Sequence, residues 1–334
     1  MLSRHGIRSL CCVAVATAVL GMSGLSSAAD KIKIGFLVKQ AEEPWFQTEW
    51  AFAEKAGKDH GFEVIKIAVP DGEKTLSAID SLAANGAKGF VICPPDVSLG
   101  PAIVAKAKAN GMKVMAVDDR FVDAKGKFME DVPYLGMAAF EVGQKQGAAM
   151  ATEAKVRNWD WKETYAIINT YNELDTGKKR TDGSVDSLTK AGLPQDHIIY
   201  APQKTLDVPG SMDSTNSALP KLPATAKNLI IGGMNDNTVL GGVRATEAAG
   251  FAAANVIGIG INGTDAIGEL KKPNSGFFGS MLPSPHIEGY KTAEMMYEWV
   301  TTGKEPPKYT AMDDVTLITR ENFKEVLTKI GLYK

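Results

Sequence analysis

The sequence predicts an α/β protein built from two doubly wound lobes, each on a parallel sheet. The chain has 334 residues, of which 44% are hydrophobic and 23% are charged. These values fit a globular protein of about two domains at roughly 100 to 200 residues each. Short apolar runs alternate with segments of helical length along the chain. Ten such runs are more strands than one doubly wound domain usually holds, so two lobes follow.

The predicted strands are short runs rich in β-branched residues and bounded by turn residues. Because the runs are continuously apolar instead of alternating, we expect parallel sheets that are covered by helices on both faces. Ten runs have this character, and they begin at Ile32, Phe62, Lys88, Met112, Tyr165, His197, Asn228, Val256, Gly276 and Asp314.

The predicted helices lie between these runs and end at residues that favour a left-handed cap. Four ends are marked in this way, at Asn85-Gly86, Asn110-Gly111, Gly192 and Gly250. Glycine is the usual residue just after a helix because it adopts positive φ at no steric cost. The chain therefore reads as a repeated strand and helix unit.

The first 29 residues are predicted to be a cleaved signal peptide. Arg4 and Arg8 precede an apolar run from Leu10 to Leu20, and small residues lead to a cleavage site after Ala29. The run breaks at Gly21, which favours a signal over a membrane anchor of about 20 residues. We therefore expect export to the periplasm.

Charge and metal-ligand patterns exclude two classes of function. The 37 basic and 39 acidic residues give a net charge of −2, without the basic excess of a nucleic-acid binder. The four histidines never fall at metal-ligand spacing, and Cys93 is the single cysteine left after cleavage. We predict no nucleic-acid partner, no metal site and no internal disulfide.

Polar side chains follow the predicted strands at their carboxyl ends, where open α/β sheets bind ligands. The first half is ionic and the second half is rich in amides. Donors and acceptors around one site suit a polyhydroxylated ligand, and an aromatic ring can cover the C–H face of a sugar. Thr176 and Arg180, at i and i+4, share a helix face. The set comprises Lys39, Glu43, Trp45, Phe46, Cys93, Asp96, Asp118, Asp119, Asn172, Thr176, Arg180, Asn235, Asp236, Asn262, Asp265 and Pro283.

Other interpretations of the same residues stay open. Taken singly, Lys39 and Glu43 also fit a solvated surface pair, and Trp45 also fits a core anchor. Adjacent carboxylates at Asp118-Asp119 and at Glu42-Glu43 suggest glycoside hydrolysis. Adjacent residues of an extended segment point to opposite sides, so neither pair alone can flank one bond, but one carboxylate from each pair can still meet across the cleft. An exported sugar-active enzyme is therefore the alternative function.

The remaining motifs do not support catalysis or a cofactor. A GxGxxG pattern at 258–263 comes late in the chain and lacks the acidic residue that binds a ribose. Cys93 has no histidine nearby in the sequence, and a packed apolar role suits it better than a nucleophilic one. We predict no cofactor and no enzymatic reaction.

Five stretches resemble the arabinose-binding group of the type I periplasmic binding proteins, the exported components of bacterial ABC sugar importers. They are GFLVKQAEEPWFQTE (35–49), FEVIKIAVPDGEKT (62–75), NELDTGKKRT (172–181), MNDNTVLGGVRATE (234–247) and GIGING (258–263). The resemblance implies two Rossmann-like lobes joined by a three-segment hinge. Sugar-responsive repressors share this fold but begin with a DNA-reading helix-turn-helix, where this chain has its export signal.

The resemblance also implies a ligand and roles for the site residues. The ligand is L-arabinose, with D-galactose and D-fucose to be tested. By resemblance Arg180 reaches the ring oxygen, Asp119 the anomeric hydroxyl, and Met137 lies beside the sugar's C5. The twelve sugar contacts that the resemblance implies are Lys39, Glu43, Trp45, Phe46, Asp118, Asp119, Met137, Thr176, Arg180, Asn235, Asn262 and Asp265. Lys39, Asn235 and Asn262 would then bind ring hydroxyls. The sequence departs from the family at Ala41, at Gly177-Lys178-Lys179 and at Arg120.

The implied lobes are discontinuous along the chain. We expect the N-terminal lobe at 30–137 plus 284–312 and the C-terminal lobe at 138–283 plus 313–334, with hinges near Met137, Pro283 and Asp313. The implied mechanism is hinge closure around the sugar and delivery to a membrane-embedded permease by a monomeric protein.

Overall fold

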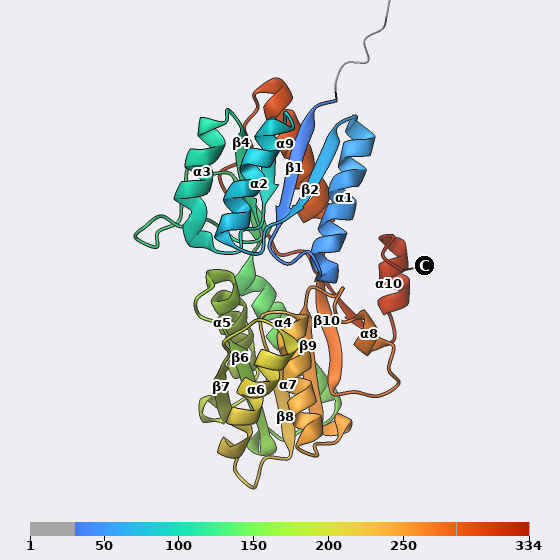
Figure 1. The fold of residues 1–334 in the computed structure, drawn as a ribbon. Coiled ribbons are helices and arrows are strands. Elements are labelled where there is room, and N and C mark those ends of the chain that lie inside the picture. Colours follow the sequence, from blue (N-terminus) through green and yellow to red (C-terminus); the bar gives the residue numbers. More distant parts are fainter. Residues whose placement is uncertain (1–30, 285, 334) are drawn as a thin grey trace, which may run out of the picture. The chain divides into compact units, whose positions relative to one another are not determined.

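A computed structural model describes residues 31–284 and 286–333, which form two six-stranded sheets with helices packed on them (Figure 1). The predicted fold class, an α/β protein with two doubly wound lobes, is confirmed. The predicted signal peptide lies outside the described residues. Within the described part of the chain, the helices are too short or too polar to cross a membrane.

The first sheet is parallel throughout and has the strand order β11-β5-β4-β3-β1-β2. Its strands are β1 (Lys33–Val38), β2 (Glu63–Ala68), β3 (Gly89–Ile92), β4 (Lys113–Val117), β5 (Tyr134–Met137) and β11 (Thr310–Met312). The accompanying helices are α1 (Pro44–His60), α2 (Gly72–Ala84), α3 (Gly100–Ala109) and α9 (Thr292–Thr302), with a 3₁₀ turn η1 (Val97–Leu99) and a π-helix η6 (His286–Lys291).

The second sheet has the order β12-β10-β9-β8-β6-β7 and is parallel except for β12, which runs antiparallel to β10. Its strands are β6 (Thr164–Thr170), β7 (Ile198–Pro202), β8 (Asn228–Gly232), β9 (Val256–Ile261), β10 (Phe277–Pro283) and β12 (Val315–Thr319). Its helices are α4 (Ala139–Val156), α5 (Asp175–Lys190), α6 (Val208–Ala218), α7 (Asp236–Ala248), α8 (Ile267–Leu270) and α10 (Phe323–Lys329). Four 3₁₀ turns complete it: η2 (Trp161–Glu163), η3 (Gln195–His197), η4 (Leu219–Lys221) and η5 (Ala253–Asn255).

Each of the ten predicted strands corresponds to a strand of the structure, and two more strands, β5 and β11, were not predicted. The two pair with each other at one edge of the first sheet, with Thr310 opposite Leu135 and Met312 opposite Met137. The predicted helix ends are also found, since Gly86 and Gly111 follow α2 and α3 with φ values of 79° and 66°. The lobe boundaries themselves stay a prediction.

Apolar side chains cover both faces of each sheet, as the continuous apolar runs predict. In β1, Phe36 belongs to the cluster on one face and Leu37 to the cluster on the other, and both are fully buried. Fully burying side chains of this size contributes about 1.5 to 3 kcal/mol each. Met296 and Trp299 of α9 complete the first cluster, although they come from the far end of the chain. The first lobe therefore depends on a late segment for its core.

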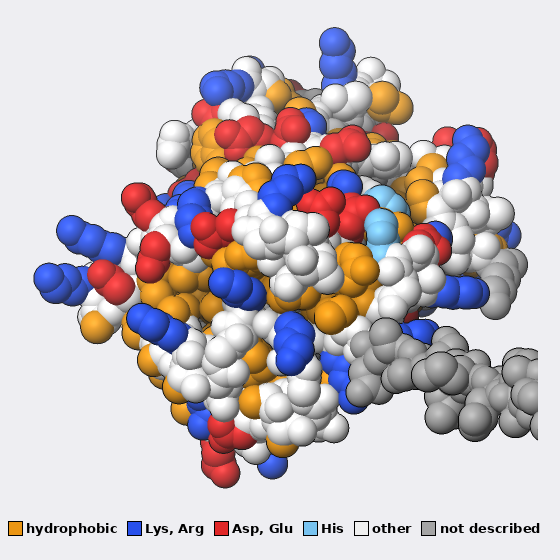
Figure 2. All heavy atoms as spheres, turned by 90° about the horizontal axis from the view of Figure 1, so that it is seen from above, with side chains coloured by type: hydrophobic (Ala, Val, Ile, Leu, Met, Phe, Trp, Pro, Cys, Tyr) orange, Lys and Arg blue, Asp and Glu red, His pale blue; other side chains and the backbone are white. Residues whose placement is uncertain are grey.

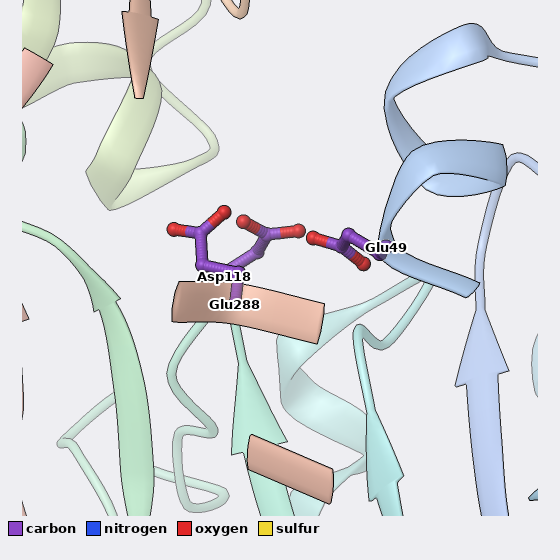
Figure 3. Close-up of side chains that lie close together, drawn as sticks. All are labelled: Glu49, Asp118 and Glu288. Carbon is purple, nitrogen blue, oxygen red and sulfur yellow. The ribbon is translucent and has the colours of Figure 1, made fainter. Parts of the chain in front are cut away.

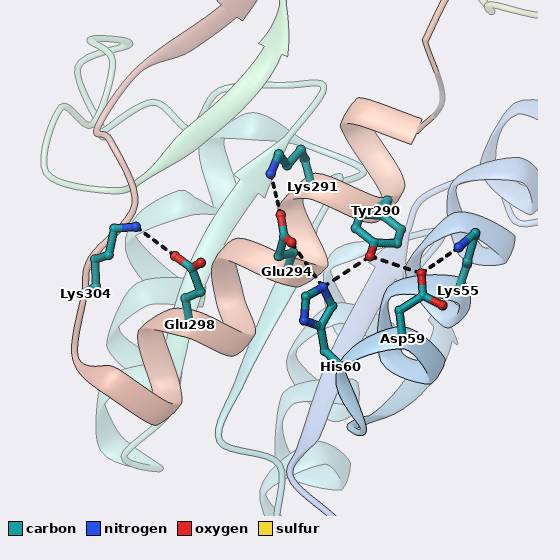
Figure 4. Close-up of polar contacts among 8 residues, drawn as sticks. All are labelled: Lys55, Asp59, His60, Tyr290, Lys291, Glu294, Glu298 and Lys304. Carbon is teal, nitrogen blue, oxygen red and sulfur yellow. Dashed lines mark hydrogen bonds and ion pairs between the residues drawn. The ribbon is translucent and has the colours of Figure 1, made fainter.

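A chain of polar contacts joins the late segment to α1 at the surface (Figure 4). His60 of α1 lies 3.0 Å from a carboxylate oxygen of Glu294, and the Tyr290 hydroxyl donates to Asp59 over 3.1 Å. Lys55 also pairs with Asp59. Figure 2 shows basic and acidic side chains side by side on the surface. Because exposed pairs contribute about 0 to 1 kcal/mol each, the apolar cluster beneath them holds α9 in place.

Candidate functional site

The predicted site residues lie in the loops that follow the strands and at the helix ends beyond them. Lys39 follows β1, Asp118 and Asp119 follow β4, and Thr176 lies in the first turn of α5. The carboxyl ends of parallel strands share one edge of a sheet, so side chains from separate parts of the chain meet there. This arrangement assembles the site.

Asp119 is the centre of the contacts that link these loops. Its two carboxylate oxygens accept from Lys39 Nζ at 2.5 Å and from Thr176 Oγ1 at 2.8 Å. Burial of Asp119 acts to raise the pKa of its carboxyl, but the Lys39 charge and the two hydrogen bonds together hold that pKa below its usual value. Asp119 is therefore ionised at neutral pH and able to accept hydrogen bonds from a ligand.

Arg180 is buried one helical turn beyond Thr176, on the same face of α5, as the i and i+4 spacing predicts. Its Nη1 donates to the Met234 carbonyl at 2.9 Å, whereas its Nε is buried without a partner among the described residues. Helix α4 packs closely against α5 at this point because Gly143 has no side chain. A Cβ on Gly143 would lie 2.0 Å from the Arg180 carbonyl oxygen. A small residue in α4 thus positions the arginine.

Two asparagines follow strands of the second sheet. Asn235 caps α7, with its side-chain oxygen accepting from the Thr238 backbone N–H at 3.0 Å. Its amide NH2 is then the group that can donate to a ligand. Asn262 follows β9 with a φ of 111°, a value that L-residues rarely adopt. Such backbone strain often accompanies functional sites.

Glu43 precedes α1 and reaches a side chain from the other lobe. It accepts hydrogen bonds from Gln40 Nε2 at 2.8 Å and from Asn237 Nδ2 at 3.2 Å. Burial and the nearby charge of Asp265 raise the pKa of Glu43 to about 7. The Glu43 carboxyl therefore changes its charge near neutral pH.

The structure brings ten of the twelve predicted residues around one cavity of about 40 Å³. Met137 instead lines an adjoining cavity of about 520 Å³, which shares Asp119 and Thr176 with the first. Asp265 lines neither of the two. The larger cavity is lined by three of these twelve residues and the smaller one by ten, so the smaller one is the candidate site. Its predicted residues are Lys39, Glu43, Trp45, Phe46, Asp118, Asp119, Thr176, Arg180, Asn235 and Asn262.

Residues 31–326 match the family model described as periplasmic binding proteins and sugar binding domain of LacI family. The chain is a periplasmic binding protein of this family. It is 59% identical to the L-arabinose-binding periplasmic protein of Escherichia coli K12, over 95% of this chain and 97% of the relative. It is 43% identical to the ABC transporter L-arabinose-binding periplasmic protein of Azospirillum brasilense, over 98% of both chains.

Solved structures support the fold of this periplasmic binding protein. A periplasmic solute-binding protein of an ABC transporter from Actinobacillus succinogenes, solved with bound D-allose, superposes with a TM-score of 0.72 at 20% identity. The match covers 88% of this chain and all of the other. A periplasmic ribose ABC transporter protein from Conexibacter woesei gives 0.70 at 19% identity. At such identities the likeness shows the fold alone.

Several residues of the binding protein's site were not predicted from the sequence. Four more side chains line the small cavity, and one reaches Glu43 across the lobes. Gln40 is the one with a sequence signal, since it directly follows Lys39. The others are Leu174, Leu206, Met234 and Asn237. Cys93 is fully buried as expected, and its Sγ also lies 3.8 Å from an Asp119 oxygen.

The geometry of the Asp118–Asp119 pair differs from the expected one. Adjacent residues on an extended segment would point to opposite sides, but both carboxyl residues line the same cavity. Asp118 has a φ of 59°, so the segment turns there instead of continuing the strand. The Tyr134 hydroxyl donates to the Asp118 carbonyl at 2.9 Å and stabilises this turn.

Proposed function

We propose that this periplasmic binding protein binds L-arabinose in the small cavity and delivers it to the membrane permease of an ABC importer. The observation that carries the proposal is the mixed lining of that cavity, with donors and acceptors contributed from both lobes. The relatives that are 59% and 43% identical over nearly the whole chain are both L-arabinose-binding periplasmic proteins. Periplasmic location and a monomeric state belong to the same proposal.

The chemistry of the lining suits a pyranose. Asp118, Asp119 and Glu43 supply acceptors, and ionised acceptors form hydrogen bonds about twice as strong as neutral ones. Donors come from Lys39, Arg180, Asn235 and Asn262. Each sugar hydroxyl donates one hydrogen bond and accepts others, so it needs both kinds of partner. Trp45 and Phe46 offer flat apolar faces that can pack against a sugar ring. Trp45 also packs in the hydrophobic core, which was the alternative role considered for it.

Hydrogen bonds between the lobes support hinge closure as the mechanism. Asp119 accepts from Thr176 at 2.8 Å, and Glu43 accepts from Asn237 at 3.2 Å. A ligand that contacts both lobes has more partners when they are close together, so it favours the closed state. The permease would then recognise the closed, loaded form.

Calorimetric titration of the mature protein tests the proposal. We expect one L-arabinose site with a Kd of about 1 μM or tighter, equivalent to about −8 kcal/mol. Arg180→Ala should weaken binding at least tenfold, because a hydrogen bond to a charged group contributes about 1.5 to 3 kcal/mol. Lys190→Ala, on the exposed end of the same helix, is the matched control. A flat titration at tens of micromolar sugar would contradict the function.

The same protein separates binding from catalysis. Incubation with arabinose, galactose and a disaccharide should return each sugar unchanged, as expected of a transport protein. A product that requires the cavity residues would instead support the sugar-active enzyme.

Discrimination between pentoses and hexoses is proposed to depend on Met137. It is buried at the end of β5 and lines the cavity next to the candidate site. Because a thioether adapts to irregular space, D-galactose and D-fucose should bind too, with altered affinity. Met137→Leu should change the ratio of arabinose to galactose affinity severalfold, whereas Met150→Leu, in the same apolar cluster, should not. Equal changes for both sugars would exclude Met137 from specificity.

A further inference from the structure

Three carboxyl groups lie close together (Figure 3), and one of them, Asp118, also lines the candidate site. Glu49 comes from α1, Asp118 from the turn after β4, and Glu288 from the π-helix η6. One oxygen of each lies within 4.8 Å of the other two. Their exposed fractions are 0%, 9% and 3%. The sequence did not predict that these three residues come together, because they are far apart along the chain.

These carboxyl groups have few partners other than one another. Both oxygens of Glu49, Oδ2 of Asp118 and Oε2 of Glu288 are buried without a hydrogen bond within residues 31–284 and 286–333. The neighbouring cations are engaged elsewhere, Lys39 with Asp119 and Arg180 with the Met234 carbonyl. Three unpartnered negative charges in such a place would be very unfavourable, so the cluster must take up protons or a cation.

Titratable groups from several elements face this cluster. Burial and then the Asp118 charge raise the pKa of both Glu49 and Glu288 well above the usual value. Lys39 opposes this for Glu49, and Arg180 opposes it for Glu288. The remaining groups that face the cluster do not supply a further cation. They are Cys93 after β3, Asp119 after β4 and Tyr134 in β5.

Asp118 connects this cluster to the ligand site. Asp118 lines the small cavity, and the backbone turns at Asp118 with a φ of 59°. Arg180 also faces Glu288, with its own Nε buried and without a partner in the described part of the chain. An acidic group held between the cluster and the cavity can accept from a sugar hydroxyl only if something fixes its orientation and relieves the repulsion behind it.

We propose that Glu49 and Glu288 are positioning residues that act as neutral carboxylic acids, each donating a hydrogen bond to the ionised Asp118 carboxylate. Asp118 then keeps its negative charge and its orientation toward the sugar. Loss of the two protons at alkaline pH would add two charges behind Asp118 and weaken sugar binding. This inference rests on the proposed function for its ligand, but not for the protonation of the two glutamates.

The first test is the pH dependence of L-arabinose affinity. Between about pH 6 and about pH 9.5 the wild-type affinity should fall at least fivefold, whereas Glu49→Gln/Glu288→Gln should vary less than twofold, because the amides stay neutral donors. Glu54→Gln, exposed on the same helix, is the matched control and should keep the wild-type profile. Glu43 is present in all these proteins, so its own titration does not produce the difference. A wild-type profile as flat as that of the double variant would overturn the proposal.

The second test detects the protonated carboxyl groups directly in the sugar-free protein. Infrared spectroscopy at neutral pH should show the carbonyl stretch of buried carboxylic acids, with an intensity that falls in each single glutamine variant and falls further in the double variant. Because other buried carboxyl groups also contribute to this band, the difference between proteins is what is read, and equal intensity in the wild type and the double variant would overturn the proposal. So would a thermal midpoint that rises with calcium or magnesium and falls with a chelator in the wild type alone, since a cation would then hold the cluster. If arabinose does not bind at neutral pH, the proposed function fails while the infrared result still decides the protonation.

Discussion

Replacing Asp119 by asparagine should destabilise the sugar-free protein substantially. The substitution keeps the size of the side chain and removes the charge that pairs with Lys39 at 2.5 Å. The two side chains are only 16% and 5% exposed, so the Lys39 ammonium would be left nearly buried without its counter-charge. Removing one partner of a buried pair costs about 3 to 5 kcal/mol. We expect the lower end, about 3 kcal/mol, because the amide oxygen still accepts hydrogen bonds.

Urea and thermal unfolding in the absence of sugar measure this effect. A loss of about 3 kcal/mol corresponds to a decrease of about 5 °C in Tm, at about 2.1 cal/mol/K of unfolding entropy per residue over about 300 residues. Because the pKa of Asp119 is lowered in the folded protein, its stabilisation is complete above the usual carboxyl pKa. It is lost as pH falls through the native pKa. The difference in free energy of unfolding between wild type and variant should therefore become smaller at acidic pH.

Two controls make the interpretation strict. Asp182→Asn removes a charge from an exposed pair with Lys178 and should cost less than about 1 kcal/mol. Lys39→Met/Asp119→Leu removes both charges and should recover much of the lost stability, since an apolar pair of similar volume can replace a buried ion pair. If Asp119→Asn changes the free energy of unfolding no more than Asp182→Asn does, the pair behaves as a surface contact and the reasoning is wrong.

Three further outcomes are expected. Gly143→Ala should lower both stability and sugar affinity, because the new Cβ would lie 2.0 Å from the Arg180 carbonyl oxygen and force α4 and α5 apart; melting curves and titrations that match wild type would contradict this. Glu43 has a raised pKa of about 7, so its contribution to stability is present below the usual carboxyl pKa and is lost as pH rises toward and past 7. Unfolding measured at several pH values should show that the free energy of unfolding declines with rising pH in the wild type and declines less in Glu43→Gln. Lys304→Ala breaks an exposed pair with Glu298 and should change the free energy of unfolding by less than about 1 kcal/mol; a larger loss would show that this surface pair contributes to holding α9.

The fold could be predicted well where strands have long apolar runs. Such runs leave no solvated face, so they indicate both the strand and the parallel sheet. The strands β5 and β11 were not predicted because their sequences, YLGM and TAM, are short and poor in β-branched residues. They form strands because they pair with each other at the sheet edge, a contact across more than 170 residues that no local pattern records.

The site could be predicted where one side chain follows one strand. Lys39 and Asn235 are found by this rule, because the strand direction alone places them at the ligand edge. Glu49 and Glu288 could not be found, since each lies inside a helical segment and looks like an ordinary polar residue of a helix surface. Their burial depends on how η6 packs on α1, with a Cβ on Gly289 coming within 2.4 Å of the Glu49 carbonyl oxygen. The roles toward the sugar stay predictions.

The dependence of the first lobe on β11 and α9 has a consequence for the order of chain synthesis. The strands up to β5 are complete at Met137, but the edge strand and the helix that covers Phe36 arrive only by Met312. At about 5 to 20 residues per second, the ribosome needs about 10 to 35 s to make the intervening stretch. During that interval α1 already packs on this sheet face, but the part that α9 covers stays exposed and the emerging chain cannot settle into its native state. A polypeptide that must leave the cell interior unfolded would benefit from this delay.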